Sequence, residues 1–200
     1  MPFLDPAGGK HNKDLKSTRA RSAIVVVGVD YIDRIWVLEA WADRCHTDEI
    51  IRRIFEMNAK WKPKVFGIEA NAMQSLFADA VMAQAKMQGV RVPILPVMQP
   101  TRVKKEFRIR AALQPVFAEH RLLFHAQSQQ ELLKEVRSFP RGQVVDLVDA
   151  LASVVSLVPR RKPKKQRDAG RDKLAAYLRR RGAPAGYIQK RVAGYGAKHG

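Results

Sequence analysis

The sequence predicts an α/β fold: a mixed β-sheet, with an antiparallel meander followed by parallel strands, and helices on both faces. Two neighbouring runs rich in β-branched and aromatic residues, 22–30 and 34–41, are separated by a tight connection and predict an antiparallel hairpin. After residue 48, segments with helical periodicity alternate with short apolar runs, a pattern typical of strands joined by helices. Hydrophobic residues make up 46% of the 200 residues, enough for a buried core.

The individual elements can be assigned in order along the chain. Residues 2–4 read as the end of a strand that precedes the hairpin. Thr47 is a candidate N-cap for a helix over 48–61, where apolar residues recur at helical spacing. The remaining expected elements are a strand at 65–69, a helix at 73–88, an edge strand at 92–97, a turn and short strand between His120 and His125, and helices at 104–120, 128–138 and 146–158.

Two parts of the chain are expected: a folded domain over residues 1–159 and a basic C-terminal tail over 160–200. Pro159 ends the last apolar helix, 160–167 reads as a basic linker, and 171–181 predicts a short helix with room for a second after it. The tail holds 14 Lys and Arg against two Asp, and so carries most of the net charge of +18. A polyanion is the natural partner, and nucleic acid fits better than a membrane because the tail has few large apolar residues.

Several classes of protein are excluded by composition. No apolar run reaches the roughly 18 residues that a membrane span needs. The first residues lack the basic start and apolar stretch of a signal peptide. The single cysteine, Cys45, rules out an internal disulfide framework and a multi-cysteine zinc site. We therefore expect a protein that is not secreted and that works in a reducing compartment.

Four carboxylates are the candidate catalytic and metal-binding residues. Asp5 and Glu69 each follow a short apolar strand, at the strand ends where α/β sheets place their ligands. Asp146 and Asp149 begin the apolar helix at 146–158 and, three residues apart, share one face of it. Carboxylates that converge repel one another unless a hard divalent cation lies among them, and two Mg²⁺ or Mn²⁺ ions can catalyse phosphodiester hydrolysis.

Each acid also has a purely structural interpretation. Asp146 can be an N-cap, Glu69 a salt-bridged strand end, and Asp5 a solvated turn residue before Pro6. From composition and spacing alone, these alternatives stay open beside the metal-dependent nuclease.

Taken together, the motifs resemble the nuclease domain of the terminase large subunit of tailed bacteriophages. The resemblance extends over about residues 3–158, and it rests on the order and spacing of short motifs. These motifs are Leu4-Asp5-Pro6-Ala7-Gly8, Gly67-Ile68-Glu69-Ala70-Asn71, Phe139-Pro140-Arg141-Gly142 and Asp146-Leu147-Val148-Asp149-Ala150-Leu151-Ala152. The resemblance implies an RNase H-like fold and a metal-dependent endonuclease that cuts concatemeric double-stranded DNA during genome packaging. The expected location is then the cytoplasm of the infected bacterial host.

The resemblance also implies roles for the four acids. Asp5 would be the metal ligand of the first strand, Glu69 the acid of the central strand, and Asp146 the ligand from the C-terminal helix, with Asp149 as a fourth carboxylate. The family often shows a His-Asp-Asp stretch before that helix, whereas this chain has Val144-Val145-Asp146. This departure leaves open whether Asp146 or Asp149 is the direct ligand, with Asp146 favoured.

Five basic residues are candidate DNA contacts. Lys104, Lys105 and Arg108 resemble the basic segment that follows the fifth strand of the family, where cations beside an acid cluster can hold a phosphate. Lys10 and Lys13 lie in the basic loop between the first two strands. A solvated basic helix start is the structural alternative for the first group.

An ATPase motor, which a complete terminase large subunit also contains, is not encoded by a recognisable motif. The stretch Gly8-Gly9-Lys10-His11 lacks the Ser or Thr after the lysine and the earlier glycine of a phosphate loop. We expect no ATP hydrolysis by this chain. By resemblance, the partners are the terminase ATPase domain, the small terminase subunit and the portal protein.

Three hypotheses therefore follow from the sequence. The first is a terminase-type endonuclease that uses two divalent metal ions. The second is another RNase H-like nuclease, of the Holliday-junction resolvase type. The third is a non-catalytic basic DNA-binding or packaging adaptor whose acids are structural.

Overall fold

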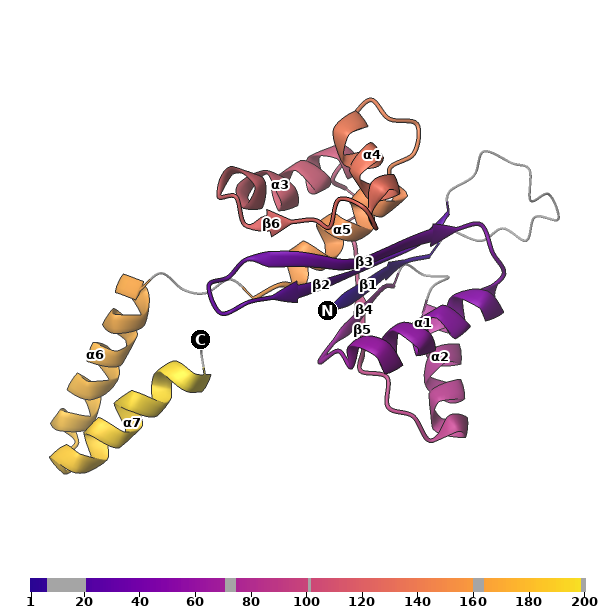
Figure 1. Cartoon of the computed structure of the whole chain (residues 1–200). Helices are drawn as coiled ribbons and strands as arrows, with labels where there is room; N and C mark the ends of the chain where they lie inside the picture. The colour runs from indigo at the N-terminus through magenta and orange to yellow at the C-terminus, as the bar shows by residue number, and fades with distance from the viewer. Residues whose placement is uncertain (7–20, 71–74, 101, 160–163, 199–200) are drawn as a thin grey trace. The chain divides into compact units, whose positions relative to one another are not determined.

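The computed structural model describes residues 1–6, 21–70, 75–100, 102–159 and 164–198 (Figure 1). Contacts divide the chain into two compact units, Met1–Val158 and Pro159–Gly200. None of the helices in the described ranges is both long and apolar enough to cross a membrane.

A six-stranded mixed sheet forms the centre of the first unit, with the strand order β5-β4-β1-β2-β3-β6. Strands β1, β2 and β3 pair in antiparallel fashion, whereas β4, β5 and β6 join parallel to their neighbours. The strands are β1 (Pro2–Asp5), β2 (Ser22–Val29), β3 (Ile35–Asp43), β4 (Phe66–Glu69), β5 (Ile94–Val97) and β6 (Leu122–Leu123). The predicted meander followed by parallel strands is confirmed, including the edge position of β5, which contains Pro96.

Five helices cover this sheet. They are α1 (Thr47–Trp61), α2 (Ser75–Gln88), α3 (Lys105–Ala118), α4 (Gln130–Ser138) and α5 (Asp146–Leu157). Each lies within three residues of its predicted bounds. One detail was wrong: the N-cap of α1 is His46, without a side-chain cap, and Thr47 is already helical.

The two faces of the sheet are covered by different helices, because side chains alternate along each strand. Phe3 and Val25 face one core, which α3, α4 and α5 complete. Leu4 and Ile24 face the other core, against α1 and α2 (Figure 1). Nearly all of α5 is buried, so the predicted apolar helix is the central helix of its layer.

The second unit is a helical hairpin of α6 (Lys164–Arg180) and α7 (Ala185–Lys198). Gly182, with φ +72°, ends α6, and the amide of Ala183 donates to the carbonyl of Leu178 at 3.1 Å. This is a Schellman-type helix end, which glycine favours because it adopts positive φ without strain. Because α6 begins at Lys164, the prediction of a basic linker over 160–167 is wrong for its last four residues.

Candidate functional site

Asp5 and Glu69 lie side by side at the carboxyl ends of two adjacent parallel strands. The register pairs Phe3 with Gly67 and Leu4 with Ile68, so the next pair along β1 and β4 is the two acids. Their side chains share a hydrogen bond. This position at the carboxyl edge of the sheet is where α/β folds commonly bind ligands.

Asp149 joins this pair from the first turns of α5. The helix packs across β1 and β2, and its side chain Leu157 comes so near to β4 that a Cβ on Gly67 would lie 2.7 Å from it and 2.6 Å from Phe3. Gly67 therefore permits a close approach of helix and sheet, which a larger residue would prevent. The side chain of Asp149 is almost completely buried.

Burial and the neighbouring carboxylates raise the pKa of Asp5 well above its ordinary value. Burial is the largest cause, followed by the negative charges of Glu69 and Asp149, while Lys105 acts in the opposite direction. Three acids from β1, β4 and α5 thus interact at one point. The sequence analysis expected four acids, including Asp146, to converge, and their catalytic and metal-binding role stays a prediction.

Asp149 is held by two cations from the start of α3. Nη2 of Arg108 lies 2.6 and 2.7 Å from the two carboxylate oxygens of Asp149, and Nζ of Lys105 lies 2.9 Å from Oδ2. Burial lowers the pKa of Lys105, but Asp149, Asp5 and Asp146 together raise it above the ordinary value. Lys105 therefore stays protonated beside the acid cluster.

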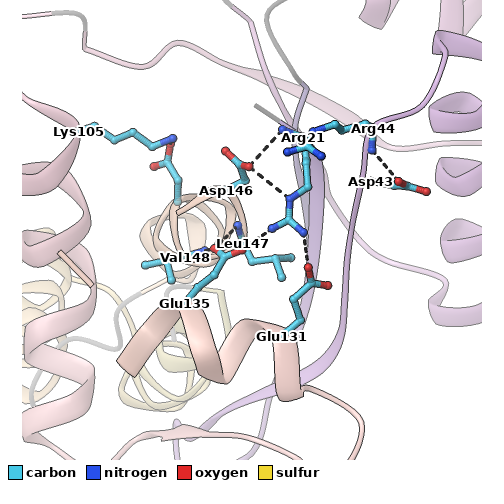
Figure 2. Close-up of polar contacts among 10 residues, drawn as sticks. Arg21, Asp43, Arg44, Lys105, Glu131, Glu135, Asp146, Leu147 and Val148 are labelled. Carbon is cyan, nitrogen blue, oxygen red and sulfur yellow. Dashed lines mark hydrogen bonds and ion pairs between the residues drawn. The ribbon is translucent and has the colours of Figure 1, made fainter. Parts of the chain in front are cut away.

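Asp146 lies one helical turn before Asp149 and contacts Arg21, the residue that precedes β2. The backbone amide of Arg21 donates to Oδ2 of Asp146 at 3.1 Å, and its Nε lies 3.5 Å from the same oxygen. Figure 2 shows Arg21 between Asp146 and the two glutamates Glu131 and Glu135 of α4. Asp146, which the sequence analysis favoured as the direct metal ligand, is therefore paired with Arg21.

The amino end of α5 is capped by a buried carboxylate from another helix. Glu135 accepts hydrogen bonds from the amides of Leu147 at 2.9 Å and Val148 at 3.2 Å, and its other oxygen lies 2.5 Å from Nη2 of Arg21 (Figure 2). Burial raises the pKa of Glu135, while the two amides and Arg21 act against this. An anion suits a helix amino end, and this cap fixes where α5 begins.

Arg21 and Glu135 were not among the functional residues predicted from the sequence. A weak signal for Glu135 exists, because it lies three residues after Leu132 on the apolar face of α4, where a charged residue needs a partner. Arg21 gave no comparable signal, since an arginine before a strand is common on any surface. Both residues act on the site by holding the start of α5.

The donors fit a hard divalent cation by their chemistry. Carboxylate oxygens are the ligands that Mg²⁺ and Mn²⁺ prefer, and the repulsion that raises the Asp5 pKa is what such a cation relieves. In the described ranges, no group of three or more His, Cys, Asp and Glu side chains is already spaced to hold a metal ion. The ion pairs on Asp149 explain part of this, because Lys105 and Arg108 occupy its oxygens.

The other predicted DNA contacts divide into two groups. Lys105 and Arg108 contact Asp149 of the acid cluster, and Lys104 is the exposed residue directly before Lys105 in the chain. Lys10 and Lys13 lie outside the described residues.

The raised pKa of Asp5 gives a stability prediction for the metal-free protein. In EDTA, we expect the free energy of unfolding of Asp5→Asn to be higher than that of wild type, because ionised Asp5 destabilises the native state. The gain in stability is largest above the raised native pKa, where it amounts to about 1.4 kcal/mol for each unit by which the native pKa of Asp5 exceeds the unfolded value. The gain disappears as the pH falls toward the unfolded pKa near 4. Urea unfolding at several pH values measures it; an advantage that grows on acidification would contradict the assignment.

Comparison with known proteins gives a family. Residues 5–122, more than half of the chain, match the model of the terminase ribonuclease H-like domain of bacteriophage T7; the match begins at Asp5 and ends before α5. A search of curated proteins returned no match. Among solved structures, Thermus thermophilus RuvC in complex with a Holliday-junction substrate has 14% identity and a TM-score of 0.43, covering 78% of this chain and 92% of that one. Fowlpox virus resolvase with Holliday-junction DNA has 12% identity and a TM-score of 0.42, covering 80% of this chain and 100% of that one.

The family match, with the observed sheet order, shows that this chain belongs to the terminase RNase H-like domains, a family of nucleases in the RNase H-like superfamily.

Proposed function

We propose that this chain is the endonuclease domain of a phage terminase large subunit, and that it cuts concatemeric double-stranded DNA during genome packaging by two-metal phosphodiester hydrolysis. The observation that carries the proposal is the convergence of Asp5, Glu69 and Asp149 at the carboxyl ends of β1 and β4. Family membership supports the terminase role.

The four carboxylates divide the work in this proposal. Asp5, Glu69 and Asp149 hold the divalent cations, Mg²⁺ or Mn²⁺, and Asp146 completes the set one turn away. When bound, the cations supply activation of water and neutralisation of charge on the phosphate. Arg21 and Glu135 keep the start of α5 in place, so that Asp149 remains beside Asp5 and Asp146 remains beside Arg21.

The cations of α3 orient the DNA. Lys105 and Arg108 lie against Asp149, and Lys104 lies next to them in the chain, so a phosphate that reaches the acids also meets three positive charges. Lys10 and Lys13 remain proposed contacts to the DNA backbone. Phosphate contacts of this kind position the duplex without reading its sequence, so we expect little intrinsic sequence preference.

The biological setting follows from the family. We propose that the domain works with the terminase ATPase domain, the small terminase subunit and the portal protein, in the cytoplasm of the infected bacterial cell. The chain itself is proposed to bind double-stranded DNA and to hydrolyse phosphodiester bonds but not ATP.

Cutting of supercoiled plasmid tests the function directly. The purified chain is incubated with plasmid in EDTA, in Mg²⁺ and in Mn²⁺, and the nicked and linear products are separated on a gel. We expect cutting with a divalent ion, none in EDTA, and none by Asp5→Asn or Glu69→Gln. Glu119→Gln is the matched control, because Glu119 is exposed at the far end of α3 and pairs only with Arg121 among the described residues.

The other outcomes separate the competing hypotheses. Equal cutting by Glu69→Gln and Glu119→Gln would refute the acid cluster as the active site. A folded wild type that binds DNA but cuts with neither metal would favour the non-catalytic adaptor. Cutting restricted to four-way junctions would favour the resolvase type.

A further inference from the structure

We propose that the α6–α7 hairpin is a second, separate binding site for the phosphate backbone of duplex DNA, distinct from the acid cluster. This unit is not needed for the chemistry described above, since every carboxylate and cation of that site belongs to residues 1–158. The inference rests on the proposed function only for the choice of duplex DNA as the ligand.

The first observation is the density of unneutralised positive charge. Residues 171–193, where the side chains of this unit are described, hold seven Lys and Arg against one acid, Asp172. Six of the seven cations are exposed: Lys173, Arg179, Arg180, Arg181, Lys190 and Arg191. Within this segment, no cation forms an ion pair with a carboxylate.

The charges of α1 show what an ordinary solvated helix looks like in the same protein. There, Arg52 pairs with both Glu49 and Glu56, and Arg53 pairs with Glu56 at 2.9 Å. The arginines of α6 and α7 have no such partners in the described segment, so their charge is available to a ligand. A polyanion is the ligand that such a surface attracts most strongly.

The second observation is that three consecutive arginines lie where α6 ends. Arg179 and Arg180 are the last residues of α6, and Arg181 follows them immediately before Gly182. The amide of Gly182 donates to the carbonyl of Arg179 at 3.0 Å, which, with the bond from Ala183 to Leu178, closes the helix end. The arginines therefore project from a defined backbone, and less conformational entropy is lost when they bind.

The third observation is a repeated pair of aromatic and cationic side chains. Tyr177 is 55% exposed with Arg181 at 5.5 Å from its ring centroid, and Tyr187 is 47% exposed with Arg191 at 5.7 Å. Buried tyrosines would serve a core, but these rings lie at the surface and order arginines that lack carboxylate partners within the described part of this unit. Tyrosine hydroxyls and arginines are both common donors to DNA phosphates.

The apolar contact between α6 and α7 is small. Ala175 and Ile188 are its buried apolar residues in the described segment, each 9% exposed, and Arg171 spans the helices by donating from Nε to the carbonyl of Val192 at 3.3 Å. This small contact joins the two helices and leaves their charged side chains at the surface. An extended polyanion, bound through charge, fits such a surface better than an apolar protein partner.

The test measures binding of the full-length protein to a short fluorescent duplex in EDTA, as a function of salt. We expect R179Q/R180Q/R181Q to weaken binding at least about tenfold at low salt, and to reduce the slope of log K against log salt by about two to three, because each lost phosphate contact removes about 0.9 from the slope. The matched control is K62Q/K64Q/K86Q, which removes the same charge from exposed positions of the first unit. We expect the control to retain nearly the wild-type slope.

Two further variants and readouts make the result decisive. R179K/R180K/R181K keeps the charge and is expected to bind within about threefold of wild type, and far-UV circular dichroism verifies that α6 and α7 remain folded. Equal losses in both glutamine triples would show a net-charge effect only and would overturn the proposal, as would unchanged binding of the arginine variant. Because EDTA stops metal-dependent cutting, a failure here leaves the plasmid assay unaffected, and a failure of that assay leaves this one interpretable.

Discussion

Replacing Lys105 by Met is expected to lower plasmid cutting about 100-fold at saturating metal and, at the same time, to raise the affinity for the metal about tenfold. The two effects have opposite signs because Lys105 has two roles. Its ammonium lies 2.9 Å from Oδ2 of Asp149 and competes with a divalent cation for that oxygen. The same charge is the one that would hold the phosphate of the bound DNA, where a charge-assisted contact is worth about 2–3 kcal/mol.

The size of the metal effect follows from the exposure of this lysine. The Lys105 side chain is 44% exposed, so solvent screens its pair with Asp149 and reduces the expected gain to about one order of magnitude. Titration calorimetry with Mn²⁺ measures the affinity, and the plasmid assay measures the rate. Lys134→Met is the matched control, since Lys134 is an exposed lysine of α4 that forms no ion pair with the acids of the cluster among the described residues. A loss of both metal binding and cutting in Lys105→Met would show that Lys105 only maintains the fold around Asp149.

Replacing Glu135 by Ala is expected to have the largest effect on stability, a loss of about 3–5 kcal/mol. Glu135 is buried, accepts from two amides at the start of α5, and neutralises the largely buried Arg21. Its removal leaves a buried charge without one partner and exposes two helix amides to an apolar surrounding. Urea unfolding, followed by circular dichroism, gives the free energy from the midpoint and slope.

Two variants separate this cap from an ordinary ion pair. Glu131 also pairs with Arg21 but is 58% exposed, so Glu131→Ala is expected to cost less than about 1 kcal/mol. Glu135→Gln keeps an acceptor oxygen for the amides and should lie between wild type and Glu135→Ala. Similar small losses in all three variants would mean that α5 is held by its apolar packing alone.

The architecture could be predicted because its signals are local. The β-branched residues of β2 and β3 and the periodic apolar residues of α1 and α5 each describe one element, and their order leaves few ways to build a sheet. Asp5 and Glu69 could also be singled out from the sequence, because a carboxylate directly after a buried strand destabilises the fold unless a cation compensates its charge.

The contacts around those acids could not be predicted from the sequence. Arg21 reaches Glu135 and Asp146 across more than 100 residues of chain, and no periodicity connects them. Likewise, the spacing of Asp146 and Asp149 places both on one face of α5 without showing which one meets Asp5. That choice depends on how α5 packs across β1 and β2, including its close approach to β4 at Gly67.

The distribution of the acid cluster along the chain has a consequence for when activity can arise. Asp5 lies on the first strand, Glu69 on the fourth, and Asp149 on a helix that begins 141 residues after Asp5. Long-range contacts of this kind form late, because the chain must first lose the entropy of closing a large loop. The half-formed domain therefore has no assembled acid cluster, and under the proposed function DNA cutting begins only after α5 has packed against the sheet. A chain that stops before residue 146 would lack both this helix and the carboxylates that it carries, so under the proposed function we expect it not to cut DNA.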